Sequence, residues 1–271
     1  MDLLIDAVGR TLNITQPPRR LISLVPSLTE WLVAIGAGER LVGVTDFCTE
    51  PAQVVGQLER IGGTKNPDRQ HIIELQPDLV LASREENRLR DVNMLEDAGI
   101  AVYVTDICSL ADVNRQLSDL TQLLGGKGHA APFLQRLHAA LAGAEAMLLQ
   151  RRRYRVLTCI WRDPWMAIGR DTYAHDLLRL CGGDNIALAF DGRYPRQPLE
   201  ALMHTDPEVI LLPDEPFCFT AADRAAFEPF ADVSAVRNGQ IHLCDGKLLL
   251  WYGERSIAAL QQGSRWFTGD T

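Results

Sequence analysis

The hydrophobic positions of this chain follow two alternating patterns along its length. Short continuous apolar runs, such as residues 21–25 and 79–82, predict buried strands. Between these runs, apolar residues recur every three to four positions and predict amphipathic helices. Short apolar strands that alternate with helices indicate parallel sheets with both faces covered. The sequence therefore predicts an α/β fold with mainly parallel central sheets flanked by helices.

The longest apolar stripe lies near the middle of the chain. It runs from Phe133 to Leu148, begins beside Pro132, which suits a first helical turn, and is followed by arginines at 151–153. About 22 residues at about 1.5 Å each predict a helix of roughly 33 Å. From this stripe alone, the helix is either a connector between two lobes or an ordinary crossover within one domain.

A weak twofold repeat favours the connector. Residues 74–83 and 201–214 both place a helix end, a proline followed by an acid, and a buried strand in the same order. We therefore predict two α/β lobes joined by one long helix. The N-terminal lobe is expected at 1–126, the connecting helix at 127–153 and the C-terminal lobe at 154–271.

Composition narrows the classes of function. The 271 residues include 35 acidic and 27 basic side chains, and the net charge of −8 argues against a nucleic-acid partner, because phosphate contacts need clustered Lys and Arg. No apolar stretch approaches the roughly 18 residues of a membrane span, so the chain is not expected to span a membrane. Six widely spaced cysteines without a CxxC pair argue against a zinc cluster. We expect a globular monomer.

The sequence contains no pattern typical of a catalytic centre. GxSxG, P-loop and HExxH motifs are absent, and the six histidines are scattered. A metal site built from loop histidines and carboxylates stays open as an alternative, but no metal ligands are predicted. We expect a protein that is not an enzyme and that needs no cofactor.

The first residues differ from a secretory signal peptide. Asp2 and Asp6 stand where such a signal has basic residues before an apolar run. The sequence as given is therefore expected to carry no export signal. Either the chain was trimmed and given a Met, or the protein stays in the cytoplasm.

Candidate binding residues lie in the loops after the predicted strands, where open parallel sheets bind ligands. Large aromatic side chains and arginines occur together in these loops, and aromatic faces beside arginine suit a broad planar or amphiphilic ligand with polar edges. The alternative is that two or three of these aromatics plug the ends of the lobes. The candidates are Phe47, Thr64 and Arg84 in the first lobe, and Trp161, Trp165, Tyr194, Asp245, Trp251, Tyr252 and Arg255 in the second.

Four segments resemble the class III substrate-binding proteins of ABC importers, the helical backbone metal receptors, whose lobes are joined by one long helix. The segments are residues 20–51 (RLISLVPSLTEWLVAIGAGERLVGVTDFCTEP), 61–68 (IGGTKNPD), 72–83 (IIELQPDLVLAS) and 177–187 (LLRLCGGDNIA). That group handles cobalamin, iron-siderophores, haem and some metal ions, and this chain is most similar to its vitamin B12-binding branch. The resemblance covers nearly the whole chain.

The resemblance assigns roles to individual residues. Phe47, Trp161 and Tyr194 correspond to aromatics that line the ligand cleft. Asp245 and Arg255 correspond to polar residues near the side chains of the corrin ring.

Three further positions concern the partner and the ligand. Glu200 corresponds to an acid that docks onto basic residues of the membrane permease. In the first lobe the corresponding position is Gln70, with Glu74 one turn away. Thr64 stands where the B12 binders carry a tryptophan.

The resemblance thus implies a periplasmic protein that holds cobalamin or a related large metal chelate in a cleft between its lobes and delivers it to an ABC importer permease. One alternative is a cytoplasmic accessory protein that binds a corrinoid or tetrapyrrole. The other is a haem or siderophore receptor, in which Tyr173, Tyr194 or Tyr252 would be the axial ligand of haem.

Overall fold

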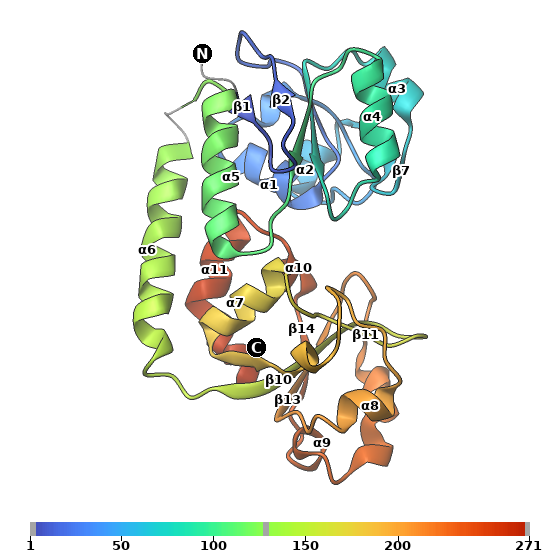
Figure 1. Ribbon diagram of the computed structural model, residues 1–271, viewed down its shortest axis with the longest axis vertical. Helices are drawn as coiled ribbons and strands as arrows, with labels where there is room; N and C mark the ends of the chain where they lie inside the picture. The colour runs from blue at the N-terminus through green and yellow to red at the C-terminus, as the bar shows by residue number, and fades with distance from the viewer. Residues whose placement is uncertain (1–3, 127–129, 269–271) are drawn as a thin grey trace. The chain divides into compact units, whose positions relative to one another are not determined.

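The computed structural model describes residues 4–126 and 130–268, which form two compact units. Unit 1 comprises residues 1–107, 111–136 and 252–254, and unit 2 comprises 108–110, 137–251 and 255–271. Each unit has a mainly parallel sheet flanked by helices, so the predicted α/β class is confirmed (Figure 1).

Unit 1 is built on a five-stranded parallel sheet in the order β5-β4-β3-β8-β9. Every residue of the strands β3, β8 and β9 is buried, which is why these segments read as continuous apolar runs. Beside the sheet lie an antiparallel lead-in hairpin and a second short hairpin. The strands are β1 (Leu4–Ile5), β2 (Thr11–Leu12), β3 (Leu21–Ser23), β4 (Leu41–Val44), β5 (Glu59–Arg60), β6 (Gly62–Gly63), β7 (Asn66–Pro67), β8 (Leu79–Ser83) and β9 (Val102–Thr105).

The helices of the first part of the chain follow the strands closely. α1 begins at Pro26, where the missing N–H costs nothing, and ends before Gly36, whose φ of 77° suits glycine. The helices are α1 (Pro26–Ala34), η1 (Gly38–Arg40), α2 (Ala52–Val55), α3 (Arg69–Glu74), α4 (Leu89–Asp97) and α5 (Leu110–Leu123).

The long central helix α6 spans Ala130–Leu148. Residues 127–129 of the predicted connecting helix lie outside the described residues. The predicted end at residue 153 was wrong, because the three arginines bind groups of unit 2 instead of continuing the helix. Arg151 donates to the Leu180 carbonyl (3.3 Å), Arg152 pairs with Glu208 (2.8 Å) and Arg153 pairs with Asp184 (2.9 Å). The border between the two units falls inside α6, and the predicted lobe boundaries stay predictions.

Unit 2 repeats the parallel arrangement. Strand β10 pairs in parallel with β12 and β13, and β14 pairs in parallel with β13. The short β11 returns antiparallel to β10. The strands are β10 (Tyr154–Trp161), β11 (Met166–Ala167), β12 (Gly183–Asn185), β13 (Val209–Pro213) and β14 (Ile241–Cys244). The helices are α7 (Tyr173–Cys181), η2 (Ile186–Ala189), α8 (Leu199–Met203), η3 (Ala221–Phe230), α9 (Ser234–Arg237), α10 (Gly246–Leu250), α11 (Glu254–Gln262) and η4 (Gly263–Phe267).

The predicted twofold repeat is confirmed at the turns that lead into β8 and β13. Gln76 and Asp206 precede the two prolines with φ of 48° and 50°. The acid after each proline accepts backbone hydrogen bonds at the start of the neighbouring strand. Asp78 accepts from the Arg20 amide (2.9 Å), and Glu208 accepts from the Arg155 amide (3.0 Å). Each unit thus uses the same turn to fix the amino end of its buried strand.

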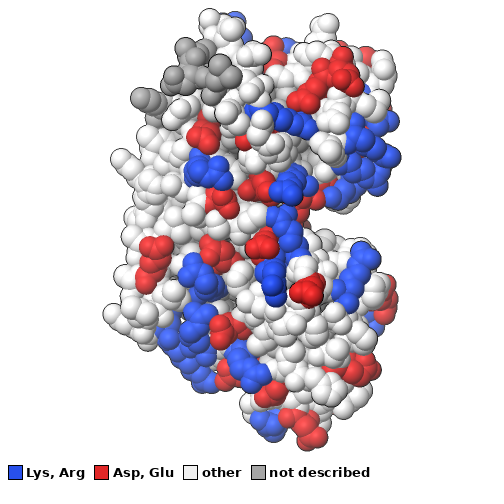
Figure 2. Space-filling model, viewed as in Figure 1, with Lys and Arg blue, Asp and Glu red and all other residues white. Residues whose placement is uncertain are grey.

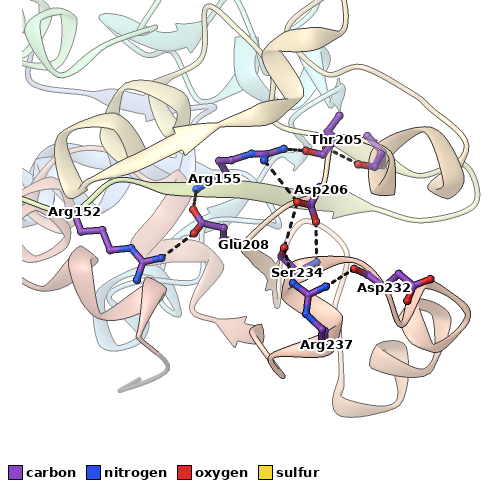
Figure 3. A network of polar contacts seen from close by, with 9 residues as sticks. Arg152, Arg155, Thr205, Asp206, Glu208, Asp232, Ser234 and Arg237 are labelled. Atoms are coloured by element: carbon purple, nitrogen blue, oxygen red, sulfur yellow. Dashed lines mark hydrogen bonds and ion pairs between the residues drawn. The ribbon is translucent and has the colours of Figure 1, made fainter.

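In unit 2 this turn is the centre of a polar network (Figure 3). The carboxylate of Asp206 accepts hydrogen bonds from the amide (2.8 Å) and hydroxyl (3.2 Å) of Ser234, at the start of α9. Arg155 lies 3.7 Å from the same carboxylate. The hydrogen bond from the Ser234 backbone, with smaller contributions from the Ser234 hydroxyl and Arg155, holds the pKa of Asp206 below its usual range.

Replacing Asp206 with alanine is expected to lower the free energy of unfolding by about 1–2 kcal/mol at pH 7, through loss of the hydrogen bonds that its carboxylate accepts from Ser234 at the start of α9. Because the folded pKa is lowered, the carboxylate's contribution is present above the unfolded pKa of about 4 and is lost as the pH falls through the folded pKa. Urea unfolding at pH 7 and pH 3 measures this. Asp206→Gly removes the carboxylate and also the β carbon that both the wild type and the alanine variant hold at positive φ, so it should lose less stability. An unchanged midpoint for Asp206→Ala at pH 7 would contradict the assignment.

Candidate functional site

The carboxyl edge of the unit 1 sheet presents one exposed aromatic ring and one ion pair. Phe47 follows β4, is 60% exposed, and lies against Gly63, where an added β carbon would be 3.4 Å from its ring. Arg84 follows β8 and pairs with Asp106, which follows β9 (2.8 Å). Three strands of one sheet, β4, β8 and β9, therefore place an aromatic face and a guanidinium at the same edge of that sheet.

Thr64 lies at the turn of the β6–β7 hairpin beside this edge. Buried Asn87 donates to the Thr64 carbonyl (2.9 Å) and accepts from the Ser83 amide (2.7 Å), so it ties the hairpin to the end of β8. Lys65 reaches the Glu85 carbonyl (2.6 Å). Asn87 could not be predicted as a site residue, since an isolated asparagine in a polar loop carries no pattern.

Tyr252 groups with unit 1, although the sequence analysis placed it with the second-lobe loops. It is 7% exposed, and its hydroxyl lies 3.4 Å from the Thr105 hydroxyl at the end of β9. Burial raises the pKa of the Tyr252 phenol well above its usual value. The ring therefore packs within the unit and presents little surface to a ligand.

The carboxyl edge of the unit 2 sheet carries a continuous row of five aromatic rings. Ring centroids lie 5.6 Å apart for Trp161 and Phe217, 4.7 Å for Phe217 and Phe219, 6.0 Å for Phe219 and Trp165, and 5.4 Å for Trp165 and Phe227. These separations fall in the range of favourable aromatic pairs. Trp161 is 41% exposed and Phe227 is fully buried. This aromatic row therefore leads from the surface into the core of unit 2.

Arg162 anchors the inner part of the aromatic row. Its guanidinium lies 5.5 Å from the centre of the Trp165 ring and pairs with Asp223. Asp223 also accepts the Thr220 amide (2.7 Å) in a capping box at the start of η3. The hydrogen bond from the Thr220 backbone, aided by Arg162, holds the pKa of Asp223 below its usual range. Trp165, a predicted ligand residue, is thus packed between phenylalanines and a fixed arginine.

A second aromatic site of unit 2 is centred on Trp251, which is 8% exposed. Lys247 and Arg255 lie 5.3 Å and 5.4 Å from the centre of its ring. Arg255 is 3.9 Å from Asp245, which caps α10 by accepting the Leu248 amide (2.9 Å). The structure therefore brings three predicted residues together, with Trp251 as the buried support for the cation of Arg255.

Two acidic residues that contact the segment around Trp251, Asp214 and Glu215, were not predicted from the sequence. The Gly246 amide donates to Asp214 (2.7 Å), and a β carbon on Gly246 would lie 2.6 Å from the Glu215 side chain, so only glycine fits there. Burial raises the pKa of the Glu215 carboxyl against the opposing effects of a hydrogen bond from Trp251 and the charge of Lys247. Both acids follow β13, but they carry no spacing pattern that distinguishes them from ordinary loop acids.

The remaining predicted residues lie on exposed or half-buried segments. Tyr194 is half-buried in a segment that pairs with β11, because the Ala167 amide donates to the Pro195 carbonyl (3.0 Å). Glu200 is exposed in the first turn of α8. Glu74 is exposed at the end of α3 and accepts a hydrogen bond from Gln70 (3.0 Å).

Two cavities lie at the opposite, amino edges of the sheets. One of about 740 Å³ is lined by residues 13–19 with Arg40 and Asp78, and one of about 600 Å³ is lined by Arg152, Arg237 and other unit 2 residues. Open parallel sheets bind ligands at their carboxyl edges, and the arginines named here are bound to backbone carbonyls and acids of their own unit. We therefore place the candidate site at the carboxyl edges of the sheets and not in the two amino-edge cavities.

Positive and negative side chains are mixed on the face of the molecule drawn in Figure 2. Figure 2 shows Lys and Arg side chains lying next to Asp and Glu over much of one face. Within residues 4–126 and 130–268, no three His, Cys, Asp or Glu side chains are grouped as metal ligands would be. The helices of these residues include none that is long and apolar enough to cross a membrane.

The amino-acid sequence of this chain is similar to those of described proteins over most of its length. A Vitamin B12-binding protein of Vibrio cholerae is 26% identical over 250 residues, 91% of this chain and 88% of that protein. A Bacillus subtilis protein described as an uncharacterized ABC transporter substrate-binding lipoprotein, YvrC, is 26% identical over 95% of this chain and 82% of its own length.

The solved structures show the same fold. The periplasmic heme-binding protein RhuT from Roseiflexus sp. RS-1, in its apo form, superimposes with a TM-score of 0.82 at 26% identity, covering 93% of this chain and 98% of that one.

Residues 21–248 match the family described as Periplasmic binding protein, whose members bind solutes and are not enzymes. The predicted resemblance is therefore confirmed, and the chain belongs to the periplasmic binding protein family.

Proposed function

We propose that this protein binds cobalamin or a related large metal chelate outside the cytoplasm and delivers it to an ABC importer. The observation that carries the proposal is the exposed Trp161 ring at the outer end of the aromatic row. A tryptophan that is 41% exposed yet backed by other rings offers a rigid apolar face. Such a face suits the flat side of a macrocycle, and the relatives described as vitamin B12-binding proteins support that choice.

In this proposal, each unit offers ligand-contacting side chains at the carboxyl edge of its own sheet. Unit 1 supplies the exposed Phe47 ring and the cation of Arg84. Unit 2 supplies Trp161, together with Asp245 and Arg255 for the polar substituents of the ligand. Apolar faces with a few charged groups at their borders are typical of sites for large amphiphilic ligands. No bond is made or broken, so the residues need only bind and release.

Haem is the second candidate ligand, favoured by the likeness to a heme-binding protein. Of the three predicted axial tyrosines, Tyr173 is buried with its hydroxyl 2.9 Å from Ser256, and Tyr252 is buried beside Thr105. Tyr194 is half-buried in a surface segment. A haem complex of this protein would therefore use Tyr194, and its absorbance spectrum would change in Tyr194→Phe.

The proposal is tested by titrating the purified protein with cyanocobalamin, haemin and a ferric siderophore. Absorbance and tryptophan fluorescence report binding, and Trp161 should make quenching visible. We expect saturable binding of cyanocobalamin with a dissociation constant in the micromolar range or below. No binding at tens of micromolar would exclude cobalamin, and saturation by haemin alone would assign the haem alternative.

Docking to the permease is expected to depend on Glu200. Reversing its charge in Glu200→Arg should leave cyanocobalamin affinity unchanged and lower cobalamin uptake by about tenfold, because charge complementarity governs the encounter of the two proteins. Uptake of labelled cobalamin by the native host measures the effect. Glu228→Arg is the control, since Glu228 is also an exposed acid of unit 2. Equal uptake by the two variants would remove Glu200 from the docking surface.

A further inference from the structure

The segment that follows β13, residues 214–219, places an aromatic ring at the candidate site that no sequence pattern indicated. Phe217 is half-buried, with its ring 5.6 Å from Trp161 and inclined by 72° to it. Its other neighbour in the aromatic row is Phe219, at 4.7 Å. Cys218, between the two phenylalanines, is exposed with a free thiol. The segment therefore has one face in contact with the core and one face open.

Both ends of this segment are fixed, so the position of the Phe217 ring is defined. At its start, the Asp214 amide donates to the Cys244 carbonyl (3.1 Å) and the Asp214 carboxylate accepts the Gly246 amide (2.7 Å). At its end, Phe219 is buried in the core of unit 2 and its amide donates to the Phe217 carbonyl (2.9 Å). A ring held in this way loses little conformational entropy when a ligand covers it.

The angle between Trp161 and Phe217 determines the shape of the surface that they form. Two rings at 72° make a corner with two apolar walls. If a flat ligand lies against one ring, the second ring meets its border. A flat ring system fills both walls when methyl groups of its border meet the second ring, whereas a compact polar chelate fills neither wall. A flat ligand and a compact polar chelate therefore differ in the apolar area that they bury in this corner, and a single exposed tryptophan would not separate them in this way.

We propose that Phe217 is a second ligand-contacting residue and that the Trp161–Phe217 corner holds a flat macrocycle, with one ring on its face and the other ring against methyl groups of its border. This inference rests on the proposed function, because it concerns the ligand of the same site. It also assigns residues 214–219 to the binding surface, with Cys218 close enough to be covered by the bound ligand.

The first test compares cyanocobalamin binding by the wild-type protein, Phe217→Leu and Phe217→Tyr. Phe217→Leu should weaken binding by about tenfold, and Phe217→Tyr, which keeps the ring, should stay within about twofold of wild type. Phe230→Leu is the matched control, because Phe230 is also half-buried and packs against the same core. Equal affinities for Phe217→Leu, Phe230→Leu and the wild type would overturn the inference.

The second test needs no variant and so does not depend on folding of a mutant. Cys218 is the exposed free cysteine of the described residues, while Cys108 is half-buried and the others are buried. Iodoacetamide labelling, read by peptide mass spectrometry, should slow at Cys218 by fivefold or more when cyanocobalamin is saturating, relative to the same protein without ligand. An unchanged rate at Cys218 in a protein that binds cyanocobalamin would contradict the inference alone. A wild-type protein that binds no cyanocobalamin would instead overturn the proposed function, and this inference with it.

Discussion

Replacing Trp161 with alanine is expected to weaken ligand binding by roughly 1–3 kcal/mol, about 5- to 150-fold in the dissociation constant, at little cost to folding. The reason is the location of Trp161 at the outer end of the aromatic row. Its ring is 41% exposed, so truncation removes ligand contact area but leaves only a small change in the packing around Phe217. Isothermal titration with cyanocobalamin and thermal unfolding of the same preparation measure the two effects.

The conservative variant Trp161→Phe should recover most of the affinity, because it keeps an aromatic face at the same position. A large drop in thermal stability with unchanged affinity would show that Trp161 belongs to the core of unit 2. The alternative that the aromatics only plug the lobe ends, which the sequence left open, would then hold for Trp161.

Replacing Phe227 with alanine should have the opposite effect. Phe227 is fully buried at the inner end of the aromatic row, 5.4 Å from Trp165, and belongs to the core of unit 2. Loss of a buried phenylalanine leaves a cavity and typically costs about 3–5 kcal/mol. We therefore expect the free energy of unfolding of unit 2 to fall by about that amount, while the folded protein keeps its affinity for cyanocobalamin.

Urea unfolding followed by tryptophan fluorescence measures this effect well, because Trp161, Trp165, Trp251 and Trp266 lie in unit 2 and Trp31 lies in unit 1. Phe227→Leu is the graded control and should lose about half as much, since most of the buried volume remains. An Ala variant as stable as the wild type would mean that the inner end of the aromatic row is not part of the core.

Much of the fold could be predicted because it rests on local patterns. Strands β8 and β13 are fully buried and read as continuous apolar runs. The turns at Gln76 and Asp206 share a proline followed by an acid, which made the repeat visible. The arginines after α6 were misread because their partners, such as Glu208 for Arg152, are distant in sequence. A helix end decided by long-range ion pairs has no local signal.

The candidate site was predicted only in part, for a related reason. Loop aromatics such as Phe47 and Trp161 stood out because they follow predicted strands, and the structure shows both exposed. Trp165 and Tyr252 also stood out, but they pack within their own units, since a position in a loop does not determine burial. Phe217 was missed because its contact with Trp161 depends on which strands are neighbours, and pairing of β10 with β13 is a long-range property.

Hydrogen–deuterium exchange with and without saturating cyanocobalamin tests the central claim most directly, because it locates the ligand without altering the protein. The account predicts protection at the carboxyl edges of both sheets, in residues 46–50 and 84–87 of unit 1 and residues 161–165 and 214–219 of unit 2. Protection at the amino-edge cavities instead, in residues 13–19 or 234–240, would contradict the account.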